Sequence, residues 1–192
     1  MRVLVACEMS GRVRDAFLAR GHYAMSCDIL PSLSDRGDHH RGDVFDLLSC
    51  SSGYWDLMIA FPPCTHLSSS GARWWPEKRA DGRQQSAVNF ARLLMGSRVP
   101  RIAIENPVGY LSTAIRKPDQ IVQPWMFGEG EVKTTCLWLK NLPALTPTNV
   151  VPGREQRVWR MPPSPERAQE RSMTYQGIAD AMASQWGSEN DG

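Results

Sequence analysis

The chain has 192 residues, a net charge of +2 and a hydrophobic content of 42%, which suit one domain with a substantial core. No segment approaches the ~20 consecutive apolar residues of a membrane span, and the first apolar run is too short for a secretory signal. We therefore expect a single-domain protein, residues 1–192, in the cytoplasm. Neither a disulfide framework nor a zinc site is indicated, because the five cysteines are widely spaced and form no C-x-x-C pair: Cys7, Cys27, Cys50, Cys64 and Cys136.

The basic residues are mostly arginines, whose planar guanidinium suits phosphates and base edges. They gather in two groups: Arg73, Lys78, Arg79 and Arg83, then Arg154, Arg157, Arg160, Arg167 and Arg171. Solvated surface charge is the ordinary alternative for many of them. His39 and His40 are adjacent, but no cysteine or acidic cluster at ligand spacing accompanies them, so we expect no metal.

Short apolar runs alternate with helical patterns along the first two thirds of the chain. Strands are predicted at 3–7, 23–30, 55–61 and 101–107, helices at 12–21 and 83–95, and a third short element at 40–48. This alternation predicts an α/β fold with a mostly parallel sheet flanked by helices. Ligands of such sheets bind beyond the carboxyl ends of the strands, where these residues fall: Ser10, Gly11, Asp28, Asp43, Cys64, Glu105 and Asn106.

The C-terminal third has a different character. Residues 141–172 are rich in proline and arginine with weak periodicity, which predicts an extended or loop-rich segment and no second core. Residues 175–186 return to helical spacing through Ile178, Met182 and Trp186, so we expect a closing helix there.

A strand that runs into Pro62-Pro63-Cys64 predicts a rigid turn, because each proline fixes its own backbone angle. The following THLSSSG suits a turn or a mobile loop. Cys64 would then be presented at the sheet edge, although a small buried side chain is the commoner fate of a lone cysteine. A phosphatase loop would need an arginine six residues later, where the chain has Ser70.

This stretch resembles the catalytic motif of DNA cytosine-5 methyltransferases. That motif is a strand opening with Asp, then Pro-Pro-Cys, then Ser-x-x-Gly-x-Arg, and the matching residues are Asp56, Pro62, Pro63, Cys64, Ser68, Gly71 and Arg73. A second signature follows in order, since VPRIAIENP is similar to the family's proline, apolar strand and Glu-Asn pair at Glu105 and Asn106. The chain also resembles small phage-encoded proteins described as methylase-like. The resemblance implies a Rossmann-like methyltransferase fold and an origin in a phage or prophage.

The family's chemistry assigns a role to each matching residue. Cys64 would add as a thiolate to cytosine C6, which makes C5 able to accept a methyl group. Glu105 would share a proton with N3, and Asn106 would brace the loop. Arg73 and Lys133 would complete the catalytic set, with Lys133 supporting the pyrimidine or the Cys64 loop. The base that removes the C5 proton is not identified, and a bound water could serve.

The resemblance implies S-adenosylmethionine as the methyl donor. The family's glycine-rich turn corresponds to ACEMSGRV, which keeps Gly11 but carries Glu8. Asp28 would bind the ribose hydroxyls, and Asp43 in RGDVFD is similar to the Gly-Asp that contacts adenine. In YQGIADAM, similar to the closing Gln-Gly-Asn motif, Gly177 could lie against the cofactor. The remaining residues expected to line the cofactor site are Ala6, Cys7, Ser10, Ile29, Val44 and Pro62.

DNA is the partner that the resemblance implies, with the target cytosine flipped out of a duplex before Cys64 reaches it. Trp74 or Trp75 could fill the vacated stack, unless they simply pack the loop. The residues expected to contact DNA are Ser68, Arg73, Trp74, Trp75, Lys78, Arg79, Arg154 and Arg157. Residues 141–172 stand in place of a full target-recognition region, which predicts low or very short sequence specificity, or a partner that supplies it.

Two other functions stay open. An enzyme could keep the chemistry of Cys64 and Glu105 but use another carbon donor or a free pyrimidine nucleotide, which would account for the altered glycine turn. Alternatively, the chain could be a DNA-binding relative without catalytic activity. Binding of S-adenosylmethionine would distinguish the methyltransferase from the enzyme with another donor. A covalent adduct on Cys64 would distinguish either enzyme from the DNA-binding relative without activity.

Overall fold

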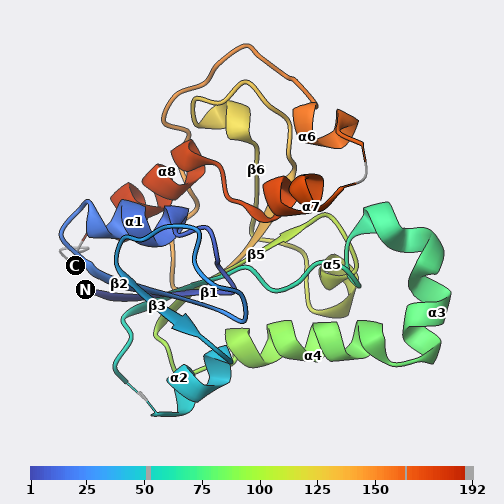
Figure 1. The fold of residues 1–192 in the computed structure, drawn as a ribbon, viewed down its shortest axis with the longest axis horizontal. Helices are drawn as coiled ribbons and strands as arrows, with labels where there is room; N and C mark the ends of the chain where they lie inside the picture. Colours follow the sequence, from blue (N-terminus) through green and yellow to red (C-terminus); the bar gives the residue numbers. More distant parts are fainter. Residues whose placement is uncertain (51–52, 163, 189–192) are drawn as a thin grey trace.

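A computed structural model describes residues 1–50, 53–162 and 164–188 (Figure 1). One sheet holds seven strands in the order β3-β2-β1-β4-β5-β7-β6. The strands are β1 Arg2–Ala6, β2 Tyr23–Asp28, β3 Asp38–Arg41, β4 Leu57–Ala60, β5 Arg101–Pro107, β6 Gln120–Val122 and β7 Thr135–Lys140. Strands β1 to β5 pair in parallel, whereas β7 is antiparallel to both β5 and β6. The predicted α/β class is thus confirmed, and the mostly parallel sheet is compatible with a Rossmann-like fold.

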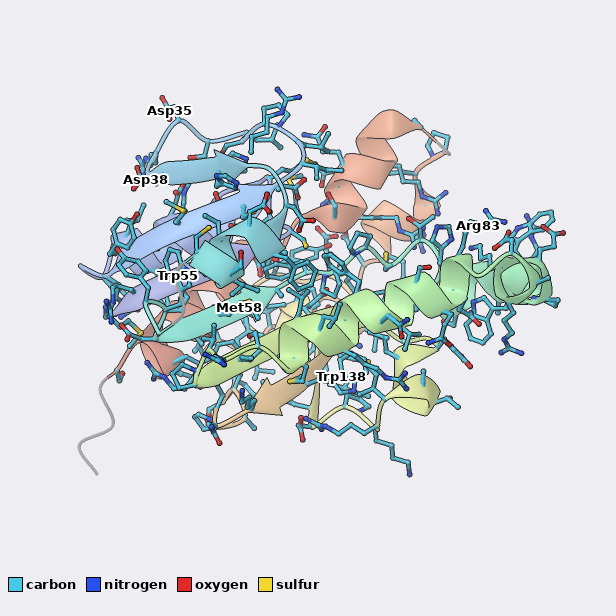
Figure 2. All side chains as sticks on the ribbon, turned by 90° about the horizontal axis from the view of Figure 1, so that it is seen from below. Asp35, Asp38, Trp55, Met58, Arg83 and Trp138 are labelled. Carbon is cyan, nitrogen blue, oxygen red and sulfur yellow. The ribbon has the colours of Figure 1, made fainter. Side chains whose placement is uncertain are left out.

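Helices cover both faces of the sheet, which is why its central strands are apolar throughout (Figure 1). On one face, Val3 and Val5 of β1 pack into a core with α1 and α8. On the other face, Leu4 and Ala6 share a core with residues of α2 and α4. Figure 2 looks at this second face, where α4 crosses the strands and Met58 and Trp138 belong to the core beneath it.

The helices follow the predicted pattern with a few differences. They are α1 Arg12–Leu18, α2 Val44–Cys50, α3 Trp75–Ala80, α4 Arg83–Met95, α5 Leu111–Ala114, α6 Arg157–Arg160, α7 Pro165–Ser172 and α8 Gln176–Trp186, with 3₁₀ turns η1 Ser69–Trp74 and η2 Pro124–Met126. Helix α1 ends before the predicted Gly21, since the chain already turns after Leu18 and Gly21 takes a φ of 79° to lead into β2.

The prediction that residues 141–172 are extended or loop-rich is wrong where the segment forms α6 and α7. Helix α7 begins where the Ser164 side chain accepts a hydrogen bond from the backbone N–H of Arg167, with Pro165 in the first turn. Serine followed by proline is a helix start signal, but the surrounding prolines and arginines hide it. No second core forms among the described residues of this segment, and α7 lies beside the sheet (Figure 1).

The parallel strands bring their carboxyl ends to one edge of the sheet. Ala6 of β1 pairs with Ala60 of β4, and Ala60 pairs with Ile104 of β5. The chain leaves β1 toward β2 on one side and β4 toward β5 on the other, so the edge between β1 and β4 is a topological switch point, the usual ligand site of such sheets. Within the described residues, no helix has the length and apolar character needed to cross a membrane.

Candidate functional site

The Pro62–Cys64 turn lies at the carboxyl end of β4 and is held from both neighbouring strands. The Phe61 N–H donates to the Ala6 carbonyl at 3.0 Å. From β5, the buried Asn106 donates its side-chain Nδ2 to the Pro62 carbonyl at 2.8 Å. The backbone N–H groups of Leu67 and Ser68 then return to the Cys64 carbonyl at 3.0 and 2.9 Å. The thiol is therefore half-buried at the sheet edge, in a turn fixed before and after it.

The segment after Cys64 is fastened as well. Lys78 of α3 is buried and donates its Nζ to the Thr65 carbonyl at 2.6 Å. The Tyr110 N–H donates to the Leu67 carbonyl at 2.8 Å. At Gly109 the two backbones come so close that any Cβ would collide with the Leu67 carbonyl. The sequence predicts either a turn or a mobile loop after Cys64. The structure has a turn, held by these contacts, which leads into η1.

Glu105 and Lys133 face the same buried region from β5 and from the residues before β7. Burial raises the pKa of Glu105, and the charge of Lys133 and a hydrogen bond with Thr135 only partly oppose this rise. Burial lowers the pKa of Lys133 against the opposing pull of Glu105, while its Nζ donates to the Met173 carbonyl at 2.9 Å. The carboxyl group therefore keeps its proton at higher pH than an ordinary glutamate.

The same charges act on Cys64. Burial raises the pKa of its thiol, the nearby carboxyl of Glu105 raises it further, and the cations of Arg171 and Lys133 lower it. The net effect favours the protonated thiol in the ligand-free site. Cys64, Glu105, Lys133 and Arg171 are thus electrostatic neighbours, brought together from the turn after β4, from β5, from the segment before β7 and from α7.

Arg171 and Thr135 also belong to this group, although the sequence predicts a catalytic role for neither. Arg171 lies in the last turn of α7 and donates its Nη2 to the Ser70 hydroxyl at 3.4 Å. The only signal in the sequence is its place among the basic residues of the C-terminal third. Thr135 begins β7 and pairs with Pro107 across the antiparallel ladder, which brings its side chain beside Glu105.

The residues expected around an adenosine also meet at the sheet edge. Cys7 follows β1 in a left-handed conformation with a φ of 58°. Burial and then the carboxylates of Asp28 and Asp43 raise the pKa of Cys7 to about 12, so these groups are close. Asp28 uses Oδ1 to accept the Leu30 N–H at 2.9 Å, and the adjoining Ile29 side chain is 73% exposed. The half-buried Asp28 carboxylate therefore lies next to an exposed apolar side chain.

Glu8 and Gly11 are occupied by the protein itself. The buried Glu8 carboxylate accepts the backbone N–H of Val13 at 2.8 Å and the Ser10 hydroxyl at 3.0 Å, so it caps the start of α1. Gly11, at a φ of 74°, leaves no room for a Cβ beside the Arg14 guanidinium and the Ser34 side chain. Both residues, and Ser10 with them, shape the turn after β1.

Four other residues expected at the cofactor have structural contacts. Ala6 and Val44 lie in the core, and Pro62 is buried beneath the Cys64 turn. Gly177 opens α8, donating its N–H to Glu129 Oε1 at 3.0 Å, and a Cβ there would collide with the Phe127 carbonyl. Close backbone packing is therefore the reason for glycine at this position.

The two tryptophans differ in their surroundings. Trp74 is 46% exposed, with the Arg73 guanidinium 5.0 Å from its ring centre. Trp75 packs against Tyr110 with ring centres 5.5 Å apart, and Arg79 lies over Tyr110 at 5.0 Å. Arg73 is thus an exposed residue of η1, and it is not among the charges that act on Cys64. Ser68 is buried and accepts the Ser70 N–H as the cap of η1.

The basic residues expected on DNA in the C-terminal third have partners within the protein. Arg157 pairs with Glu131 at 2.8 Å and with Glu170 at 3.2 Å, so two carboxylates compensate its charge. Arg154 lies 3.8 Å from the ring centre of Trp125. Across the part of the chain that the structure describes, no group of three or more His, Cys, Asp or Glu side chains could hold a metal ion.

Comparison with known proteins adds no family to this picture. No protein-family model matches the chain, and no curated protein matches it at a significant level.

Proposed function

We propose that this protein transfers a methyl group from S-adenosylmethionine to C5 of cytosine in DNA through a covalent bond between Cys64 and C6. The observation that carries the proposal is the meeting of a thiol, a proton-holding carboxyl group and two cations at one sheet edge. A pyrimidine placed there needs a nucleophile at C6 and a proton donor at N3. Cys64 and Glu105 supply these groups.

The side chains support the reaction in a definite order. The Cys64 proton must leave first, and the positive charges of Lys133 and Arg171 favour the thiolate that remains. When sulfur bonds to C6, electron density moves toward N3, where the protonated Glu105 donates its hydrogen bond. The C6 bond makes C5 nucleophilic, so C5 would take the methyl group while the sulfonium sulfur of the donor keeps the electron pair of the broken bond. Loss of the C5 proton to a base or a bound water then breaks the bond between C6 and sulfur, which restores the aromatic ring and the Cys64 thiolate.

Part of the predicted cofactor set fits an adenosine. Asp28 has one oxygen engaged with Leu30, which leaves the other for a ribose hydroxyl, and the exposed Ile29 offers an apolar surface for a base. Bound S-adenosylmethionine would supply an electrophilic methyl group at the edge between β1 and β4. Glu8 and Gly11, whose groups are taken up by α1, would act only by shaping the turn.

One observation favours a second candidate, a pyrimidine C5-modifying enzyme with a different carbon donor. The carboxylate of Glu8 already caps the helix start where a glycine-rich turn would leave backbone N–H groups free for a ligand. The chemistry of Cys64 and Glu105 would be the same. Calorimetric titration with S-adenosylmethionine separates the two, because only the methyltransferase binds it.

The test is transfer of labelled methyl from S-adenosylmethionine to cytosine-containing DNA, single-stranded and duplex. We expect label at cytosine C5 with the wild-type protein and none with Cys64→Ser. Cys50→Ser is the matched control, because Cys50 is an exposed cysteine at the end of α2, and its activity should equal that of the wild type. Absence of transfer to either DNA by the wild type would refute the proposal.

A further inference from the structure

We propose that Arg171 binds the phosphate attached to the target nucleotide, and that it exchanges its contact with Ser70 for that phosphate when the substrate enters. This inference rests on the proposed function and adds to it the residue that binds the substrate's phosphate, a group that a free base or nucleoside lacks. It also gives the α7 helix a function.

The position of Arg171 is the first argument. Its guanidinium reaches from the last turn of α7 to Ser70, 101 residues away in sequence, in the turn that follows Cys64. It therefore spans the two segments that flank the half-buried thiol. A base that reaches Cys64 and Glu105 must leave its sugar and phosphate outside, on the side where Arg171 lies.

The second argument is the weakness of its present contact. A 3.4 Å hydrogen bond from an exposed guanidinium to a neutral hydroxyl contributes little, whereas a phosphate accepts two parallel, charge-assisted bonds. Two other arginines of this region are better satisfied: Arg157 has two carboxylates, and Arg154 lies against Trp125. None of the described carboxylates forms an ion pair with Arg171.

The third argument is electrostatic. Arg171 is exposed, yet its charge lowers the pKa of Cys64 and also that of Lys133. A phosphate that neutralises Arg171 would remove part of this help to the thiolate. Lys133, which is buried deeper, would remain as the cation beside the sulfur.

The test measures the binding constant for a short single-stranded oligonucleotide with one cytosine. Fluorescence anisotropy reports the binding at several salt concentrations. We expect Arg171→Ala to weaken binding about tenfold and to reduce the slope of log K against log salt by about 0.7, the value for one phosphate contact. Arg171→Lys keeps the charge but loses the paired bonds, so it should keep the slope and lose part of the affinity.

Two controls separate this role from simple support of the fold. Ser70→Ala removes the same 3.4 Å contact but leaves the guanidinium free, so its affinity should equal or exceed that of the wild type. Arg160→Ala removes an exposed arginine from α6 and should leave the slope unchanged. The inference is overturned if Arg171→Ala keeps the wild-type slope, if Ser70→Ala weakens binding as much, or if the wild type does not bind the oligonucleotide.

Failure of the proposed function gives a different result. If the wild-type protein binds DNA with the expected dependence on Arg171 but transfers no labelled methyl, the phosphate site stands and the methyl-transfer proposal falls. If transfer occurs and is insensitive to Arg171→Ala with an unchanged salt slope, only the inference about Arg171 falls.

Discussion

The hydrogen bond from Asn106 to the Pro62 carbonyl allows the most direct test of what holds the Cys64 turn in place. Asn106→Ala removes the only donor that the buried Asn106 side chain directs at the Pro62 carbonyl, at 2.8 Å. The other side-chain atom, Oδ1, is buried without a hydrogen-bond partner, so its loss costs no bond. Leaving a buried carbonyl unpaired costs about 1–3 kcal/mol, and we take about 2 kcal/mol for this change.

Urea unfolding followed by circular dichroism measures the change in the free energy of unfolding. For a chain of this size, about 2 kcal/mol corresponds to a fall in melting temperature of about 4–8 °C. Methyl transfer should fall about a hundredfold, because the Cys64 turn loses its brace and small misplacements of a nucleophile are costly. Asn89→Ala, at an exposed position on α4, is the control and should change the stability by less than about 0.5 kcal/mol.

Asn106→Asp sharpens the test, because it keeps the shape of the side chain but replaces the donor with an acceptor facing the Pro62 carbonyl. It should be less stable than Asn106→Ala. If Asn106→Asp were as stable as the wild type, or if Asn106→Ala cost less than about 0.5 kcal/mol, the bond would not be what holds this turn.

Other expected outcomes follow from the site and its surroundings. Glu105→Gln should shift iodoacetamide labelling of Cys64 to lower pH, because the carboxyl that raises the thiol pKa is lost, yet reduce methyl transfer by about 10²–10⁴-fold. Folded protein holds the Glu105 proton more tightly than the unfolded chain does. The free energy of unfolding should therefore fall as pH rises above 4.5, less steeply in Glu105→Gln, in urea titrations at several pH values. Gly177→Ala should lower the free energy of unfolding by about 1–3 kcal/mol through its collision with the Phe127 carbonyl. Gly71→Ala should not, because its Cβ would meet only the Lys78 Nζ at 3.5 Å, an ordinary contact, and its φ is negative.

The arrangement of the sheet could be predicted from the sequence because it depends on local patterns. Residues 3–7 and 57–60 are apolar at every position and 101–107 is apolar at its centre, a pattern typical of strands covered on both faces. Parallel pairing then brings Cys64 and Glu105 to one edge without further information. The position of α4, Arg83–Met95, follows from its helical spacing in the same way.

Partners that are distant in sequence could not be predicted. Glu8 caps α1 and Gly177 packs on the Phe127 carbonyl, and in each case the residue type alone fits a cofactor site equally well. Lys78 is a further example, since a lysine in a basic stretch suggests phosphate binding, yet its buried ammonium holds the Thr65 carbonyl. These roles depend on which backbone groups the fold leaves unpaired, which no local pattern reveals.

The contacts that hold the turn after Cys64 also decide when this turn loses its conformational entropy. Lys78, Asn106 and the close approach at Gly109 fix this turn when the chain folds, so little conformational freedom remains to be lost when a substrate arrives. If the substrate is DNA, as proposed, the cost of reaching the thiol then falls on the nucleic acid, whose base must unstack. A cytosine that is already unpaired, in a loop, a mismatch or a single strand, should therefore react faster than one in an intact duplex.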